Sequence, residues 1–402
     1  MKKSVKERKK TPGKTDKKAL LQENENKTNP TTVGKTVIQI NQASKRPATS
    51  KPITYSELSK RKPIPAKERP KPIIKSLLPP KELKPRKIIE KEEPPITLSL
   101  SSNIILQQIK SLKVHDRGVL VLLLLKDGRI ASCANDALIK IINPQKNYKV
   151  DLELIGHKGA ITYICQLDNG QLVTSSLDYA LIFWELIEGN QYRIVATIKK
   201  AHYDLVWKVI ALTKNRIASC AEDRLIKIWS CLEPFTLMHT FEGHTMSVRS
   251  VIQLRGREKI VSGGNDGAIR VWNTETYQAE TSLEEVYCRN NHCLLELYDG
   301  IIMVAGFNII TFLDLNRVVI IKSLINVEFG QLFSLIELSK DILLFVGENL
   351  KFILYNRETE TIESIQSTHT EPIRGLMNSK DNSFLSCSTD KTIRVWEYTL
   401  PE

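Results

Sequence analysis

Beyond residue 104, the chain alternates short apolar runs with polar stretches that favour turns. The runs are rich in Ile, Val and Leu, and they are separated by turn formers such as KDG at 126–128 and DNG at 168–170. Runs of this length are typical of β-strands, and VLVLLLL at 119–125 is typical of a strand buried on both faces. They are far shorter than the roughly 20 residues that a membrane-spanning helix needs. The pattern therefore predicts an all-β protein with no membrane span.

One arrangement of polar residues recurs within these runs. Five segments, among them IASCANDALIKII at 130–142 and IASCAEDRLIKIW at 217–229, align on an aspartate. Each has a Ser or Thr four residues before the aspartate and a His 21 or 22 residues before it; four copies have a Trp six residues after it. The sets are His115, Ser132 and Asp136; His157, Thr174, Asp178 and Trp184; His202, Ser219, Asp223 and Trp229; His244, Ser262, Asp266 and Trp272; and His369, Ser386, Asp390 and Trp396.

The spacing of the sets indicates how many units the chain holds. His115 and His369 are 254 residues apart, which leaves room for six intervals of about 42 residues, the length typical of a four-stranded propeller blade. Two further units, at 283–315 and 325–356, keep the strand runs without the polar set. There the alignment puts Tyr287 and Glu328 in the histidine places, Phe307 and Asn349 in the aspartate places, and Leu313 and Tyr355 in the tryptophan places.

On these residues the sequence resembles the WD-repeat β-propeller family over about 105–398. It departs from the family pattern in that Trp184, for example, is followed by Glu185 instead of Asp, and the Gly-His pair occurs only at 156–157 and 243–244. The resemblance implies an all-β, seven-bladed propeller of four-stranded blades over 96–402. The segment at 104–114 is expected to pair with the last blade and close the ring. The resemblance also implies that His, Ser or Thr, Asp and Trp form a buried network within each blade.

A set of Ser, His and Asp also invites a hydrolase interpretation, because histidine can accept a serine proton while a carboxylate orients it. Recurrence in five copies argues against a single active site. The segment VGKT at 33–36 resembles the end of a phosphate loop, but Asn29 stands where that motif needs glycine. We therefore expect no catalytic residue, no metal site and no cofactor. The seven cysteines form no C-x-x-C pair, which favours a reducing cytoplasm, with the nucleus as the alternative.

Candidate binding residues follow from the family resemblance, which implies that partners bind near the central opening on the face that carries the His and Asp turns. The residues five positions after each histidine place are Leu120, Thr162, Trp207, Arg249, His292, Phe333 and Arg374. Trp207, Arg249, His292, Phe333 and Arg374 have the composition of a binding hot spot. We predict that they capture a peptide with acidic and apolar residues. The alternative is that they only pack against neighbouring turns.

The first hundred residues differ in composition from the rest. They hold 26 Lys and Arg against 10 Asp and Glu, a net charge of +16, whereas the whole chain carries +13, so the remaining 302 residues carry −3. They also hold 13 of the 17 prolines and a single aromatic residue, Tyr55. Such a segment cannot bury enough apolar surface to fold alone. We expect 1–95 to be a disordered, Lys/Pro-rich basic tail, which could be an import signal, a linker, or a ligand for RNA, DNA or an acidic protein surface.

Together these features favour a non-catalytic scaffold or adaptor that docks partner peptides on the propeller, within a multiprotein complex, with the basic tail as a flexible anchor. Two alternatives stay open on the sequence. The propeller could be the substrate-recognition subunit of a ubiquitin ligase, or the protein could be an assembly factor for nucleic acid or ribonucleoprotein that binds through the tail.

Overall fold

The computed structural model describes residues 96–400, apart from 189–190, 285–292, 327 and 381. Residues 1–95, expected above to be a disordered basic tail, lie outside the described residues. The described residues form 29 β-strands, one 3₁₀ turn at Pro144–Lys146 and no α-helix, so the predicted all-β class is confirmed. No helix in this part of the chain is long and apolar enough to span a membrane.

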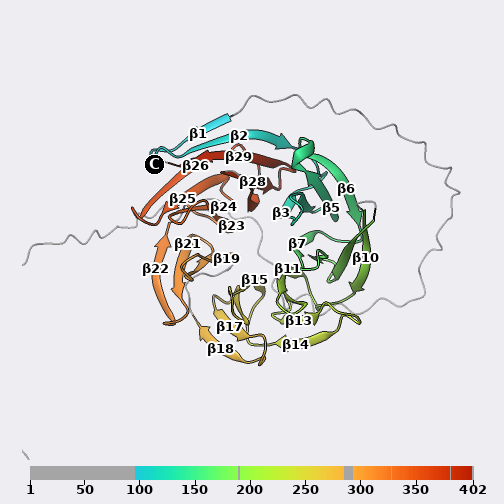
Figure 1. Ribbon diagram of the computed structural model, residues 1–402. Helices are drawn as coiled ribbons and strands as arrows, with labels where there is room; N and C mark the ends of the chain where they lie inside the picture. Colours follow the sequence, from blue (N-terminus) through green and yellow to red (C-terminus); the bar gives the residue numbers. More distant parts are fainter. Residues whose placement is uncertain (1–95, 189–190, 285–292, 327, 381, 401–402) are drawn as a thin grey trace, which may run out of the picture. The chain divides into compact units, whose positions relative to one another are not determined.

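The described strands form seven antiparallel sheets around a central opening, which confirms the predicted seven-bladed propeller (Figure 1). Blade 1 contains β3 (Val119–Leu124), β4 (Ile130–Ala134), β5 (Leu138–Asn143) and β6 (Lys149–Ile155); blade 2 contains β7 (Ile161–Gln166), β8 (Leu172–Ser176), β9 (Leu181–Ile187) and β10 (Gln191–Ile198). Blade 3 contains β11 (Val206–Leu212), β12 (Arg216–Ala221), β13 (Ile226–Ser230) and β14 (Leu237–Phe241); blade 4 contains β15 (Val248–Gln253), β16 (Lys259–Gly264), β17 (Ile269–Asn273) and β18 (Ala279–Leu283). Blade 5 contains β19 (Cys293–Glu296), β20 (Ile302–Ala305), β21 (Ile309–Asp314) and β22 (Val319–Ile325); blade 6 contains β23 (Leu332–Glu337), β24 (Ile342–Gly347), β25 (Lys351–Asn356) and β26 (Thr361–Gln366).

Blade 7 combines both ends of the described chain. Its inner strands are β27 (Ile373–Asn378), β28 (Ser383–Ser388) and β29 (Ile393–Thr399), and β2 (Ile105–Leu112) pairs antiparallel with β29. A further strand that the sequence pattern did not predict, β1 (Ile96–Ser99), pairs with β2 and makes this sheet five-stranded. Because strands from the two ends share one sheet, the ring closes without leaving a blade incomplete (Figure 1).

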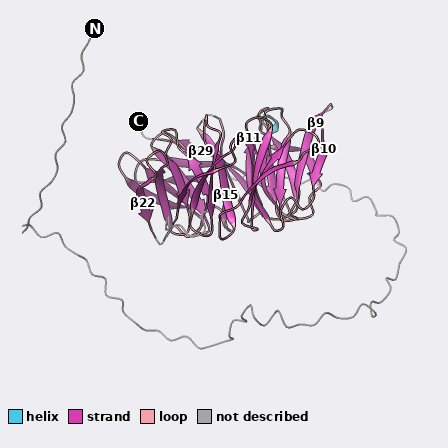
Figure 2. Cartoon of the chain, turned by 90° about the horizontal axis from the view of Figure 1, so that it is seen from below, coloured by secondary structure: helices cyan, strands magenta, loops and turns pink. Residues whose placement is uncertain are grey.

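The hydrophobic core lies between the blades. Its buried residues in the described part of the chain fall into seven clusters, and each cluster joins two neighbouring blades. Figure 2 shows the ring from its side, with the strands of successive blades standing next to one another. Short, almost wholly apolar strands such as β4 and β24 are therefore buried on both faces.

The two faces of the ring carry different turns. We call one face the upper face; it carries the β4–β5 turn, the loop before β3 and the equivalent turns and loops of the other blades. We call the opposite face the lower face; it carries the β3–β4 turn and its equivalents. Pairing of Val119 with Ala134 brings the start of the inner strand next to the end of the second strand. The loop that carries the repeated histidine therefore meets the turn that carries the repeated aspartate.

Hydrogen bonds join the repeated residues in all five sets. The histidine Nδ1 lies 2.8–3.0 Å from an aspartate oxygen, and its Nε2 lies 2.7–2.8 Å from the Ser or Thr hydroxyl. In the four sets with a tryptophan, its Nε1 donates to the same hydroxyl at 2.8–2.9 Å. The aspartate also accepts from the backbone amides that follow the histidine and the aspartate, as Asp178 does from Lys158 and Ala180. The network thus ties the two upper turns of each of these blades together.

Blades 5 and 6 replace this network with apolar packing. Leu313 pairs with Ile302 and Tyr355 pairs with Leu343, the same places in the ladder where Trp229 pairs with Ile217. In blade 6 the Asn349 side chain donates to the backbone carbonyl of Glu328, so the two turns are still joined. Tyr287 lies outside the described residues. Apolar packing is therefore enough to form a blade. The polar network adds a connection between the upper turns of the blades that have it.

The network shifts the acidity of its members. Burial raises the pKa of Asp178 and Asp266, but hydrogen bonds and the charge of His157 or His244, together with backbone amides, outweigh burial and lower each pKa to about 2. Burial lowers the pKa of His202 and His369, and their hydrogen bonds to the partner aspartates only partly oppose it. Both kinds of shift make the folded protein less stable as the pH falls. The reason is that the unfolded chain binds protons at these aspartates and histidines more readily than the folded chain does.

We expect Asp266→Asn to lower the stability of the full chain at neutral pH and to reduce its sensitivity to acid. The folded pKa of Asp266 lies below its unfolded value near 3.8, so its contribution is present above about pH 4 and is lost as the pH falls towards 2. A shift of this size corresponds to about 2 kcal/mol. Urea midpoints measured from pH 7 to pH 3 test this. Asp168→Asn, at a side chain that is 98% exposed, is the matched control, and equal midpoints for the two variants would contradict the prediction.

Candidate partner-binding site

The predicted rim residues occupy one special position in the backbone. In blade 3 the pairing passes from Val206 with Ala221 directly to Lys208 with Cys220, which leaves Trp207 as the extra residue of a β-bulge. The same shift occurs at the equivalent residue of five other inner strands, at Leu120, Thr162, Arg249, Phe333 and Arg374. Bulges re-aim side chains next to binding sites. His292, the seventh rim position, lies outside the described residues.

These bulged residues line one central cavity. The cavity has a volume of about 450 Å³ and is lined by residues from all seven inner strands, β3, β7, β11, β15, β19, β23 and β27. In Figure 1, the labelled strands β3, β7, β11, β15, β19 and β23 surround the central opening. Trp207, Arg249, Phe333 and Arg374, which are far apart in the sequence, are all half-buried in this cavity. The ring therefore brings four of the five predicted binding residues into one site.

Trp207 and Arg249 form a pair across the boundary between blades 3 and 4. The Arg249 guanidinium carbon lies 3.8 Å from the centroid of the indole ring, a stacked arrangement that favours the cation. Glu222 holds both residues: Trp207 Nε1 donates to its carboxylate at 2.7 Å, Ser247 Oγ donates at 2.8 Å, and Arg249 Nη2 lies 3.4 Å away. Burial lowers the pKa of Arg249, and the charge of Glu222 opposes that effect.

Phe333 and Arg374 form a second pair, between blades 6 and 7. The Arg374 guanidinium carbon lies 3.9 Å from the centroid of the phenyl ring. In the described part of the chain, Arg374 has no ion pair with a carboxylate. Burial lowers the pKa of Arg374, and the nearby charge of Arg249 lowers it further. The two stacked pairs are thus alike in geometry and different in electrostatics.

The repeated Ser, His and Asp sets do not form a reactive site. The hydroxyls of Ser132, Ser219, Ser262 and Ser386 belong to completely buried residues, and the last three also receive the tryptophan N–H. A substrate has no access to a nucleophile in this position. Burial also raises the pKa of Cys220 to about 12, which keeps its thiol protonated at neutral pH. Within the described residues, no group of three or more His, Cys, Asp or Glu side chains could hold a metal ion.

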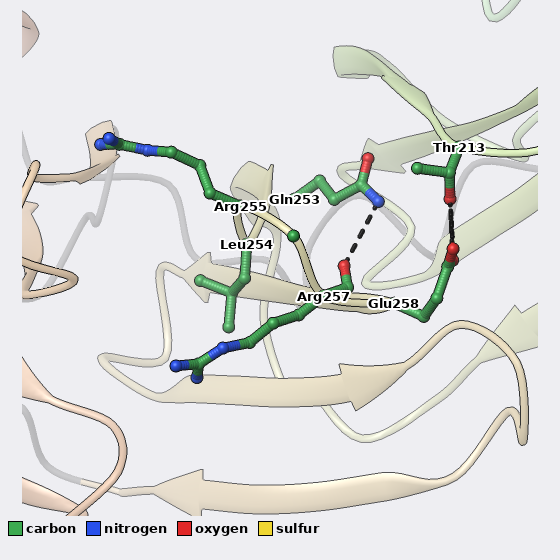
Figure 3. A pocket seen from close by; sticks show the side chains of 7 residues that line it. Thr213, Gln253, Leu254, Arg255, Arg257 and Glu258 are labelled. Carbon is green, nitrogen blue, oxygen red and sulfur yellow. Dashed lines mark hydrogen bonds between the residues drawn. The ribbon is translucent and has the colours of Figure 1, made fainter.

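A second hollow, on the lower face, differs from the central cavity in its charges. It has a volume of about 420 Å³ and lies at the β15–β16 turn, lined by Thr213 and residues 253–258 (Figure 3). Its carboxylate, Glu258, accepts from Thr213 at 2.7 Å and pairs with Arg216 at 2.7 Å. Arg257 donates to Asn316. The polar groups of this hollow are therefore engaged with one another or with adjacent residues, whereas two of the three cations that line the central cavity, Lys208 and Arg374, have no acidic partner within the described residues.

Comparisons with known proteins agree with this architecture. Residues 235–273 and 361–397 match the family model "WD domain, G-beta repeat". A serine-threonine kinase receptor-associated protein from Gallus gallus is 25% identical over 254 residues, which is 61% of this chain and 69% of the relative. DDB1- and CUL4-associated factor 10 from Homo sapiens is 24% identical over 119 residues, 30% of this chain and 21% of the relative. The crystal structure of the WD40 β-propeller domain of Doa1 has a TM-score of 0.61 at 17% identity, covering 73% of this chain and 97% of that one.

The chain contains WD40 repeats within a seven-bladed β-propeller. The two segments that match the family model contain the outer part of blade 3, the first three strands of blade 4, and the parts of blades 6 and 7 that carry His369, Asp390 and Trp396. WD40 propellers typically serve as protein-interaction scaffolds and are usually non-catalytic. In this propeller the bulged rim positions hold different residues in different blades: Leu120, Thr162, Trp207, Arg249, Phe333 and Arg374.

Sequence reasoning missed two residues that shape the site. Glu222, which organises the first stacked pair, immediately precedes the repeated Asp223, and Lys208 follows the bulged Trp207 and lines the cavity. A signal for Glu222 does exist, because the residue before the repeated aspartate varies between copies: Asn135, Leu177, Glu222, Asn265 and Thr389. A variable residue next to an invariant one within an internal repeat is a candidate for a role specific to its blade.

We expect Glu222→Ala to destabilise the full chain by about 1–2 kcal/mol, because it leaves the Trp207 N–H and the buried Arg249 charge without their acceptor. Glu222→Gln should have a smaller effect, since its amide oxygen can still accept from Trp207. Urea denaturation measures both effects. Glu242→Ala, at an exposed residue of the WD40 propeller's upper face, is the control, and a Glu222→Ala variant as stable as this control would count against the prediction.

Proposed function

We propose that this protein is a non-catalytic scaffold whose upper face captures partner peptides that carry acidic and apolar residues. The observation that carries the proposal is the convergence of Trp207, Arg249, Phe333 and Arg374 in one cavity, in two stacked pairs held by their bulged backbone. Aromatic and arginine side chains provide most of the binding energy at protein interfaces. Their stacking reduces the entropy lost on binding, because the guanidinium groups are already oriented.

The apolar part of the cavity supports a mixed ligand. Leu120 and the rings of Trp207 and Phe333 are partly exposed apolar groups among the residues that line the cavity, so a peptide can bury an aliphatic side chain beside a carboxylate. The names of two similar proteins, a receptor-associated protein and an associated factor, also describe association with other proteins. These names support the general role and leave the partner of this chain to experiment.

The triple variant Trp207→Ala, Arg249→Ala and Arg374→Ala should abolish partner capture and leave the thermal midpoint nearly unchanged, because Glu222 keeps its hydrogen bond from Ser247 and is partly solvated. The full chain serves as bait in native lysate, with washes at low and high salt. The matched control removes the same kinds of side chain from the lower face: Arg255→Ala, Arg257→Ala and Tyr298→Ala. There the guanidinium carbon of Arg255 lies 5.1 Å from the centroid of the Tyr298 ring. Defined proteins that are retained by wild type and control but lost by the upper-face variant support the proposal. Retention of the same proteins by the wild type, the control and the upper-face variant would refute the proposal.

A second candidate function is membership of a larger complex as a recognition subunit, for example in a ubiquitin ligase. The similarity to DDB1- and CUL4-associated factor 10, over 30% of this chain, favours this candidate. In that case a constant set of subunits should co-purify with both the wild type and the upper-face triple variant, because assembly and peptide capture would use different surfaces. Loss of every co-purifying protein in the triple variant would exclude a separate assembly surface.

The basic segment 1–95 is proposed as an anchor, and an assembly factor that binds nucleic acid through it is the remaining alternative. Its net positive charge predicts binding that weakens steeply with salt, because each phosphate contact releases counterions. Nuclease treatment and a salt series during the same capture experiment separate this contribution from that of the propeller. Material that resists both treatments would argue against an anchor on nucleic acid.

A further inference from the structure

The central cavity has an unbalanced charge. Among the described residues that line it are three cations, Lys208, Arg249 and Arg374, and no Asp or Glu. The carboxylate of Glu222 lies beside the cavity and is engaged by Trp207, Ser247 and Arg249. One of the three cations therefore has an acidic neighbour, and two have none within the described part of the chain.

Arg374 is the first of these two cations. Its guanidinium lies over the Phe333 ring, and its five N–H donors lie in the guanidinium plane, so the stacking contact does not consume them. Gly375 follows it, and a Cβ there would lie 2.9 Å from the sulfur of Cys387. The strand that carries Arg374 is thus packed closely against its neighbour. The stacking contact orients the guanidinium over the ring, and its N–H donors are not used by that contact.

Lys208 is the second cation. Its Nζ lies 3.3 Å from the hydroxyl of Ser250 and 4.9 Å from the centroid of Tyr163. Both partners are neutral, so they orient the ammonium group without neutralising its charge. The three residues lie on inner strands of neighbouring blades, β11, β15 and β7. Lys208 is thus presented to the same cavity as Arg374.

Partly desolvated cations without a counter-ion are unfavourable in the free protein. Arginine does not relieve this penalty by losing its proton, because its pKa stays far above neutral. Arg374 and Arg249 also repel each other, since the charge of Arg249 lowers the pKa of Arg374. An anion bound in the cavity would reduce both unfavourable effects. Buried charge that the fold does not use is characteristic of binding sites.

From this geometry we infer that the central cavity binds an anionic side chain of the partner, with Arg374 and Lys208 as the groups that contact the anion. Arg249 has a different role: together with Glu222 it fixes the indole of Trp207 as one wall. The anion is the carboxylate of an acidic residue or the phosphate of a phosphorylated one, since both accept the donors that these cations offer. This inference rests on the proposed function, which supplies a partner peptide as the ligand. It adds the chemical nature of the side chain that the cavity binds.

Trp207 provides a local reporter for the test. Among the five tryptophans, Trp184, Trp229, Trp272 and Trp396 are at most 5% exposed, whereas Trp207 is half-buried at the cavity. Collisional quenching of the full chain should therefore act mainly on Trp207, and the difference from Trp207→Phe isolates its emission. Iodide, caesium and acrylamide then compare an anionic, a cationic and a neutral probe at constant ionic strength.

We expect iodide to quench Trp207 at least about threefold more effectively than caesium, because a positive cavity concentrates anions. The double variant Lys208→Gln and Arg374→Gln should remove most of this preference and leave quenching by acrylamide unchanged. Arg255→Gln with Arg257→Gln removes the same charge from exposed positions on the lower face and should keep the preference. Equal quenching by iodide and caesium, or an unchanged preference in the cavity variant, would overturn the inference.

Short capped peptides identify the source of the anion. Three peptides carry glutamate, phosphoserine or glutamine at the centre of the same leucine- and alanine-containing sequence. Protection of Trp207 from iodide by the glutamate peptide supports a carboxylate ligand, and protection by the phosphoserine peptide alone supports a phosphate ligand. In either case the glutamine peptide and the cavity variant should show no protection. Failure of both anionic peptides to protect Trp207 would overturn the inference.

The two proposals can fail separately. If partner capture depends on the rim while Trp207 shows no preference for iodide, the rim binds its partner without an anion, and only the anion inference is wrong. If the iodide preference and its loss in the cavity variant are observed while capture is independent of the rim, the cavity is an anion site and the proposed docking function is wrong.

Discussion

The burial of both faces of every sheet against its neighbours is the constraint on which this structure depends. Each of the seven hydrophobic clusters joins two blades, so a blade has no complete core of its own and needs a blade on either side. A ring satisfies this requirement for every blade at once. Closure through β2 on β29 supplies the last interface, between blades 7 and 1, and β1 then covers the outer edge of that sheet.

This constraint explains why blades 5 and 6 persist without the polar network. Leu313 and Tyr355 fill the places that tryptophan holds elsewhere, and the inter-blade clusters remain continuous through Phe312 and Phe345. The hydrogen-bonded sets add stability and join the upper turns, but the burial of apolar surface forms the ring. A residue that recurs at one position in several blades therefore serves the fold. A residue that differs between blades at the same position is free to serve another role.

Variation is tolerated at the bulged residues because their side chains leave the interfaces between blades and enter the central cavity. There the protein places Trp207, Arg249, Phe333 and Arg374, and it arranges them as two stacked pairs. Glu222 neutralises the first pair, and the described residues offer no carboxylate to the second. This asymmetry of charge, more than the size of the cavity, is the basis of the anion site that we propose.

The sequence by itself determined the all-β class, the number of blades and the strand that completes the last sheet, because repeat length, turn formers and the His, Ser or Thr, Asp and Trp sets are all local in the chain. It also pointed to Trp207, Arg249, Phe333 and Arg374 by their offset from each histidine place. It did not indicate β1, whose four residues, Ile96–Ser99, lack a pattern that distinguishes a strand. Only the tertiary structure decided that these residues are bulged, which of them stack, and that Glu222 compensates Arg249 while Lys208 and Arg374 have no acidic partner in the described chain. Apart from the contact of Trp207 with Glu222 inside blade 3, those relations join residues about 27 to 45 positions apart across blade boundaries, and they exist only once the closed ring brings neighbouring inner strands together.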